Sequence, residues 1–124
     1  MAAPNIVNVA TITAKTATAL LAGTGAVNAL NNPASSGKVM KVNSLIISNV
    51  DGTNSATITV AIYPNDDLAG TAVVIASTIA VPADSFVVII DKNQGLYLEE
   101  DKSLGVTASA ANDLTYTVTY EELS

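Results

Sequence analysis

The carboxylates of three segments are the side chains best placed to do chemistry. Asp51 opens the segment Asp51–Asn54, which begins like a calcium loop. Such a loop needs a bidentate carboxylate at its twelfth position, and that position is Ile62. A hairpin turn is therefore the favoured interpretation. The clusters Asp66-Asp67 and Glu99-Glu100-Asp101 could share one Ca²⁺ across folded loops, but solvated loop tips are the commoner outcome.

Nucleophiles and bases are scarce. The chain has no His and no Cys, and all five of its cations are lysines, so Arg is absent too. Serine then lacks its ordinary activating base, and the neighbouring Ser36 and Lys38 are interpreted as a polar turn. Paired carboxylates could serve a glycosidase, but no Trp is present to line a sugar cleft. We expect no enzyme, with no catalytic residue, no cofactor and no metal.

Charge and composition restrict the partners. Eleven acids against five lysines give a net charge of −6, which should repel nucleic acid and anionic membranes. Only 13% of the residues are charged and 49% are hydrophobic, which is unlike a disordered acidic tail. No apolar run approaches the roughly 20 residues of a spanning helix, and the N-terminal segment lacks the cationic start of a signal peptide. We expect assembly in a cytoplasm.

Period-2 alternation dominates the chain and predicts strands bounded by turn residues. Helix competes in the two Ala-rich segments 17–21 and 26–30. The candidate strands are Asn5–Thr13, Ala17–Leu21, Ala26–Leu30, Lys38–Val50, Ala56–Tyr63, Ala72–Val81, Phe86–Asp91, Leu96–Leu98, Leu104–Ala110 and Leu114–Glu121.

Three of these segments carry further expectations. Lys38–Val50 and Ala56–Tyr63 should form a hairpin across Asp51-Gly52, because Asp-Gly suits a tight turn. Lys38–Val50 changes its apolar face near Ser44-Leu45, which predicts a bulge or bend. Ala72–Val81 is continuously apolar, so it should be buried on both faces or bend.

The last candidate strand alternates most regularly. Tyr116, Val118 and Tyr120 share one face with Leu114, opposite three threonines. Packing in the core is the favoured interpretation, and a subunit interface is the alternative. The whole chain, residues 1–124, is predicted to be a single all-β domain: an antiparallel β-sandwich, jelly-roll-like, of about eight strands. Residues 1–15 could be a strand of the domain or an N-terminal arm.

Several blocks, in this order along the chain, carry a resemblance: Gly37–Thr53, Val81–Ser85, Gly95–Glu100, Val106–Ala110 and Tyr120–Glu122. Together they cover about two-thirds of the sequence, and the chain resembles small virion structural proteins of tailed phages, especially cyanophages. The resemblance leads us to expect glycine after Glu100, where this chain has Asp101-Lys102. It implies a β-sandwich without catalytic residues.

The resemblance also implies a role and partners. We expect a virion protein, most specifically a capsid decoration or cement protein that stabilises the phage head by binding capsomer surfaces. Its partners would be the major capsid protein or other virion proteins, and it would form a homo-oligomer. The alternatives are a tail, baseplate or neck component, or a fibre-tip module that binds glycans.

Overall fold

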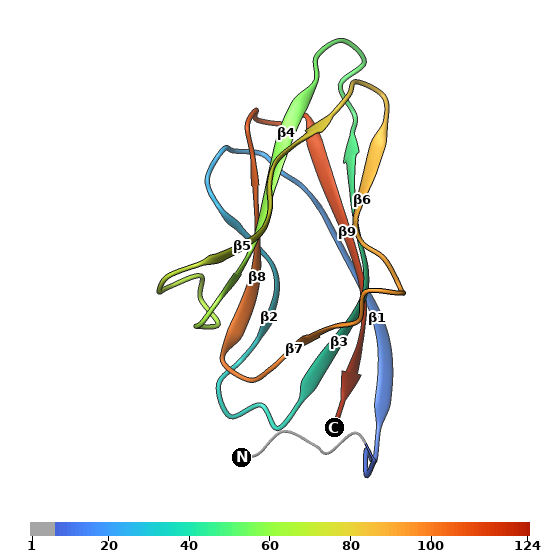
Figure 1. Cartoon of the computed structure of the whole chain (residues 1–124), viewed down its shortest axis with the longest axis vertical. Helices are drawn as coiled ribbons and strands as arrows, with labels where there is room; N and C mark the ends of the chain where they lie inside the picture. The colour runs from blue at the N-terminus through green and yellow to red at the C-terminus, as the bar shows by residue number, and fades with distance from the viewer. Residues whose placement is uncertain (1–6) are drawn as a thin grey trace.

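The computed structural model describes residues 7–124, and these form nine β-strands and no helix (Figure 1). These residues include no helix long and apolar enough to cross a membrane. The strands are β1 (Ile12–Leu20), β2 (Val27–Asn32), β3 (Val39–Asn49), β4 (Ala56–Tyr63), β5 (Val73–Val81), β6 (Phe86–Ile90), β7 (Leu96–Leu98), β8 (Lys102–Ala108) and β9 (Leu114–Leu123).

The strands form two antiparallel sheets. Sheet A has the order β1-β9-β3-β6, with β7 also paired to β3, and sheet B has the order β2-β8-β4-β5. The pairs are nested, because β4 pairs with β5, β3 with β6 and β7, β2 with β8, and β1 with β9. The chain is thus one long hairpin rolled up on itself, and the pairs β3–β9 and β4–β8 close the roll. This is a jelly-roll β-sandwich, as the sequence predicted.

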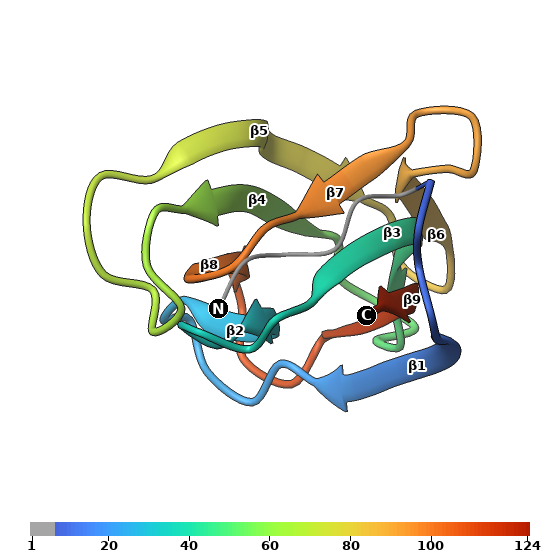
Figure 2. The same ribbon diagram turned by 90° about the horizontal axis from the view of Figure 1, so that it is seen from below.

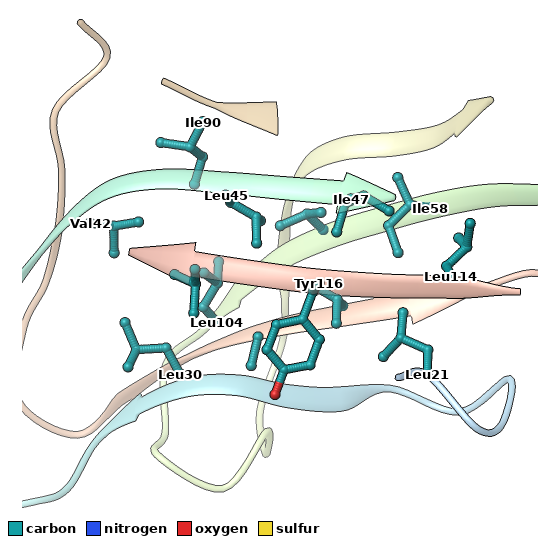
Figure 3. Close-up of a cluster of buried hydrophobic side chains, with 14 of the residues drawn as sticks. Leu21, Leu30, Val42, Leu45, Ile47, Ile58, Ile90, Leu104, Leu114 and Tyr116 are labelled. Atoms are coloured by element: carbon teal, nitrogen blue, oxygen red, sulfur yellow. The ribbon is translucent and has the colours of Figure 1, made fainter. Parts of the chain in front are cut away.

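The core lies between the two sheets (Figure 3). Side chains alternate between the two faces of a strand. From Leu114 to Tyr120, every second residue of β9 therefore points inward, and so do the residues that pair with them on β3. The largest fully buried side chains are aliphatic: Leu21, Leu45, Ile47, Ile58, Leu98, Leu104 and Leu114, together with Val42, Val60, Val81, Val106 and Val118. Branched aliphatic side chains pack closely on pleated sheets.

The expected hairpin between β3 and β4 is wrong. β3 lies in sheet A and β4 in sheet B, so the segment Val50–Ser55 crosses from one sheet to the other at the top of Figure 1. The Asp51 carboxylate accepts hydrogen bonds from the backbone N–H groups of Thr53 (2.8 Å) and Asn54 (3.3 Å) and so shapes the loop as a turn. Turn chemistry therefore fixes the loop, but strand pairing depends on which partners bury the apolar faces.

The first strand lies further along the chain than expected. Asn5 and Ile6 fall outside the described residues, and the segment from Val7 to Thr11 is not a strand. β1 instead begins at Ile12 and absorbs most of the weaker candidate at 17–21. The physical reason is the length of the partner: Ile12 pairs with Leu123, where β9 ends. Upstream, the backbone N–H groups of Ala10 and Thr11 donate to the carbonyl of Ser124, and the Thr11 carbonyl accepts from the N–H of Ser124, past the end of β9.

Two bends follow from the sequence. The pairing of β3 with β9 shifts between Val42 and Ser44, and both Val42 and Leu45 are buried, so the predicted change of face is confirmed. β5 also bends: its pairing with β4 shifts twice, and Thr78 adopts a positive φ of 46°. Burial of β5 on both faces is wrong, because eight of its nine residues keep at least partial exposure.

Candidate assembly surfaces

One side of the sandwich is apolar. We define the apolar side by seven exposed side chains of β5, β6 and β7, each between 39% and 65% exposed: Val73, Val74, Ile75, Ile79, Phe86, Val88 and Tyr97. They account for seven of the eleven large apolar side chains that are exposed among residues 7–124. Strands β5, β6 and β7 contain no charged residue. Exposed large apolar side chains in this number are common where a protein contacts another protein.

A hollow runs along the apolar side between the two sheets. It has a volume of about 240 Å³ and is lined by Ile75 of β5, Ile89 and Ile90 of β6, Gln94 and Leu96. β5 is the edge of sheet B and β6 the edge of sheet A, so the core is open to solvent between them. The lining of the hollow is apolar except for Gln94, so it is suited to an apolar side chain.

The opposite side of the sandwich, between β1 and β2, is polar. Figure 2 shows β1 and β5 on opposite sides of the molecule. Glu122 Oε1 lies 3.1 Å from Lys15 Nζ and 3.3 Å from Lys38 Nζ, so one carboxylate joins β9, β1 and the loop before β3. Partial burial would raise the pKa of Glu122, but the hydrogen bonds and charges of both lysines outweigh it and lower the pKa. The same contact raises the pKa of Lys15.

A wider cavity of about 570 Å³ opens on this polar side, where Lys38 and Glu122 meet Asn28, Asn31 and Tyr120. Asn28 Nδ2 donates to the carbonyl of Asp66 (3.0 Å). Its buried Oδ1 accepts no hydrogen bond from any residue between 7 and 124. An unpaired buried acceptor is unusual, so the cavity could take a ligand that donates a hydrogen bond.

The outer face of sheet A is uncharged over three successive rows of residues. Thr16 pairs with Thr119, and Thr18 pairs with Thr117. The rows continue across β3 through Ser44, Ile46 and Ser48 and reach Val88 and Phe86 on β6. Hydroxyl and apolar side chains fill these rows, and no charged side chain interrupts them.

The structure places the three candidate interface residues inside the sandwich. Tyr116, Val118 and Tyr120 are each at most 9% exposed, and Tyr116 points from β9 between the sheets (Figure 3). Burial raises the pKa of the Tyr116 hydroxyl. The three side chains therefore pack in the core. Their role in a subunit interface stays a prediction, and they expose almost no surface for one.

The acidic segments Asp66-Asp67 and Glu99-Glu100-Asp101 lie next to each other, and hydrogen bonds join them. The Asp66 backbone N–H donates to Asp101 Oδ1 (3.3 Å), and the Asp66 carboxylate accepts from the backbone of Ala34 (3.1 Å). At the other end of the sandwich, desolvation and the charge of Asp51 raise the pKa of Asp113. Within residues 7–124 no three acidic side chains converge as metal ligands would.

Sequence reasoning missed both the apolar side and the contact of Glu122 with Lys15 and Lys38. The signal for the first was present: nine residues from Val73 to Val81 contain no charge, but this run was interpreted as a buried or bent strand. Glu122 gave no signal, because its partners are distant in sequence and come together only through the pairing of β9 with β1 and β3.

The fold places the chain among jelly-roll β-sandwiches. No protein-family model and no curated protein matches its sequence. Among solved structures, a chain of the disulfide-linked pili formed by Bacillus endospore appendages has a TM-score of 0.53 at 17% identity, over 92% of this chain and 88% of that chain. This likeness shows a shared fold alone.

Two virus structures are also similar, at lower TM-scores. A chain of the acid-stable capsid of Helicobacter pylori bacteriophage KHP30 has a TM-score of 0.49 at 11% identity, over 94% of this chain and 90% of that chain. A chain of the IBDV viral particle has a TM-score of 0.49 at 8% identity, over 90% of this chain but only 31% of that chain.

Proposed function

We propose that the chain is a virion structural protein, most specifically a capsid decoration or cement protein of a tailed phage. The observation that carries this proposal is the apolar side, where β5, β6 and β7 expose seven large apolar side chains without one charge. Exposed apolar surface of this kind is a liability in a protein that stays single, and it is expected in one that binds a neighbour.

The action would be mechanical. The protein would bind capsomer surfaces of the assembled head, with the major capsid protein as its main partner, after assembly in the host cytoplasm. Because it would bind the assembled shell and not the free capsid subunits, it would stabilise the shell by mass action. Many copies arranged by the symmetry of the shell would multiply a modest contact. The sequence resemblance to phage virion proteins supports this role.

The shared fold with the pilus subunit is independent support for a structural role. That protein forms an extended assembly, and its chain is nearly the length of this one, because the likeness covers 88% of it. A jelly roll of this size is thus compatible with repeated protein–protein contact. The apolar side and the three uncharged rows on the outer face of sheet A favour a protein partner.

The first experiment is quantitative mass spectrometry of purified particles of the phage that encodes the chain, measuring its molar ratio to the major capsid protein. A ratio near one, or near a simple fraction of one, is expected for a protein spread over the shell. A ratio of roughly one hundredth would assign the chain to the tail, baseplate or neck. Absence from the particle would overturn the virion proposal.

A second experiment tests the surface. Phage heads lacking the protein are incubated with the purified chain, and binding is measured by co-sedimentation. Phe86→Lys places a charge on the apolar side and should weaken binding at least tenfold. Asn31→Lys adds the same charge on the polar side, also at an exposed strand position, and should leave binding unchanged. Equal binding by both variants would rule out the apolar side as the contact.

The alternative of a fibre-tip module that binds glycans is favoured by one observation. The cavity on the polar side presents Asn28, Asn31, Lys38 and Glu122 together, and Asn28 Oδ1 has an unused acceptor position. Sugar hydroxyls are donors that could fill it. Binding of the isolated protein on a glycan array, lost in Asn28→Ala, would support this alternative.

A further inference from the structure

β5 is the free edge of sheet B, and its side chains give that edge little protection. Natural edge strands are guarded by charges, prolines, bulges or short length. β5 has nine residues, no charge and no proline. Val74, Ile75 and Ile79 are each exposed over more than a third of their surface. The other long edge, β1, carries Lys15, and the edge β2 carries three asparagines.

The sequence of β5 is nearly the same in both directions about its centre, Ser77. If two copies of the strand lie antiparallel about a two-fold axis at this residue, Ser77 faces Ser77 of the second copy. Ile75 then faces Ile79, and Val74 faces Ala80. Each β-branched residue meets an apolar partner, and no charge is brought near another. A strand with this self-complementary order fits a second copy of itself better than an arbitrary partner.

The protection that β5 does have limits how it can be used. Its two bulges against β4 interrupt the row of backbone donors and acceptors. Thr78 N–H is already occupied, since it donates to Thr59 Oγ1 (3.0 Å). An added ladder of backbone hydrogen bonds is therefore short and interrupted near the axis, and it serves to set the register. The facing side chains supply most of the contact. The polar edges β1 and β2 do not match β5, so the association should close after two copies.

We propose that two copies of this chain associate through β5, antiparallel and about a two-fold axis at Ser77. The contact buries Ile75 and Ile79 of each copy against the other and covers the hollow beside Ile75. This inference stands on β5 alone, and the exposed side chains of β6 and β7 on the apolar side, Phe86, Val88 and Tyr97, stay outside the dimer contact. It holds whether or not the larger assembly is a virion. A dimer that fails to bind phage heads would overturn the proposed function and leave this inference intact.

The test uses engineered cysteines in the full chain, which has no Cys of its own. Ser77→Cys places two thiols beside the axis, where a disulfide can form. Under mild oxidation it should give most of the protein as a disulfide-linked dimer on non-reducing gels. Val74→Cys is the matched control, because its two copies would lie roughly 20 Å apart and should stay unlinked. Equal cross-linking of both variants, or none in Ser77→Cys, overturns the proposed register.

Sedimentation equilibrium of the protein without cysteines provides the second measurement. The unmodified chain is expected to be a dimer at 100 µM, and Ile79→Lys is expected to raise the dissociation constant at least a hundredfold. Thr18→Lys, an exposed position on the opposite edge strand β1, should leave it unchanged. Circular dichroism checks that each variant is folded. A monomeric unmodified chain, or a Thr18→Lys effect as large as that of Ile79→Lys, overturns the proposal.

Discussion

The side-chain amide of Asn49 donates a hydrogen bond to the backbone carbonyl of Val81, at 2.9 Å, and thereby joins β3 of sheet A to β5 of sheet B. The same amide donates to the carbonyl of Asn54 (2.9 Å), and Asn49 Oδ1 accepts from the N–H of Asp51 (2.9 Å). The Asn49 side chain is 4% exposed, and it thus uses both of its donors and one of its two acceptor positions. It holds the crossing loop that replaces the expected hairpin.

We expect Asn49→Ala to lower the free energy of unfolding by about 2–4 kcal/mol, because it removes the partner of the buried bond to the Val81 carbonyl and of the partly buried bonds to the Asn54 carbonyl and the Asp51 N–H. Urea denaturation followed by circular dichroism measures the change. Asn31→Ala is the control, since Asn31 is exposed on β2. If both substitutions cost the same, the loop does not depend on Asn49.

Gly105 of β8 lies under the ring of Tyr63. A Cβ at this position would lie 2.6 Å from Tyr63 Cε1 and 3.0 Å from Leu68 Cδ2. Gly105→Ala should therefore lower the free energy of unfolding by about 1–3 kcal/mol through overpacking. In the Tyr63→Ala background the same change should cost clearly less, as a double-mutant cycle would show. An unchanged cost in that background would contradict the contact.

Asp113 makes the stability depend on pH. Its pKa is raised in the folded protein, chiefly by desolvation and then by the charge of Asp51. The folded state therefore disfavours the ionised form of Asp113. This group destabilises the folded protein at neutral pH, and the destabilisation disappears as the pH falls through its raised pKa. Asp113→Asn should raise the melting temperature at pH 7 and have no such effect at pH 3.

The control for Asp113→Asn is Glu99→Gln, an exposed position that changes the net charge equally. Differential scanning calorimetry at both pH values compares the two. A rise of the same size in Glu99→Gln would assign the effect to net charge and not to the pair Asp51–Asp113.

Glu122 makes the stability depend on pH in the opposite direction. Its pKa is lowered because hydrogen bonds from Lys15 and Lys38 outweigh its partial burial. Its contribution is present above the pKa of the unfolded chain and is lost as the pH falls through the lowered pKa. Glu122→Gln should cost up to about 1 kcal/mol at pH 7, less at high salt, and nothing at pH 2.

The neighbouring Glu121→Gln serves as the control for Glu122→Gln, because Glu121 points to the other face of β9 and forms no ion pair with any residue between 7 and 124. Thermal melts at the two pH values, with and without 1 M NaCl, separate them. A pH-independent cost for Glu122→Gln would mean that packing and not charge explains its effect.

Much of the fold could be predicted from local patterns. β4 and β7 begin and end where the alternation placed them, and the bulge near Ser44 follows from a change of the apolar face. Turn residues located most loops, but β2 extends through Asn31 and Asn32, where such residues predicted a loop. Pairing could not be predicted from the same patterns, since Asp51-Gly52 suits a hairpin and a crossing loop alike, and only the partners of β3 and β4 decide between them.

The candidate surface was less predictable than the fold. The sequence of an uncharged strand such as Val73–Val81 is the same whether a neighbouring strand covers it or it lies at the edge of a sheet. Its exposure depends on the strand order, which places β5 last in sheet B. Tyr116 and Tyr120 could belong to a core or an interface for the same reason, and the packing of β9 against sheet B settles them inside the protein.

The nested pairing of the strands also sets when the protein can form during its synthesis. β9 lies between β1 and β3 and is the central partner of both. Until the ribosome has released residues 114–123, β1 has no partner within its own sheet, and β3 lacks the strand that pairs along one of its edges. β1 must therefore wait for the C-terminal end of the chain, so the completion of sheet A is late, non-local and comparatively slow.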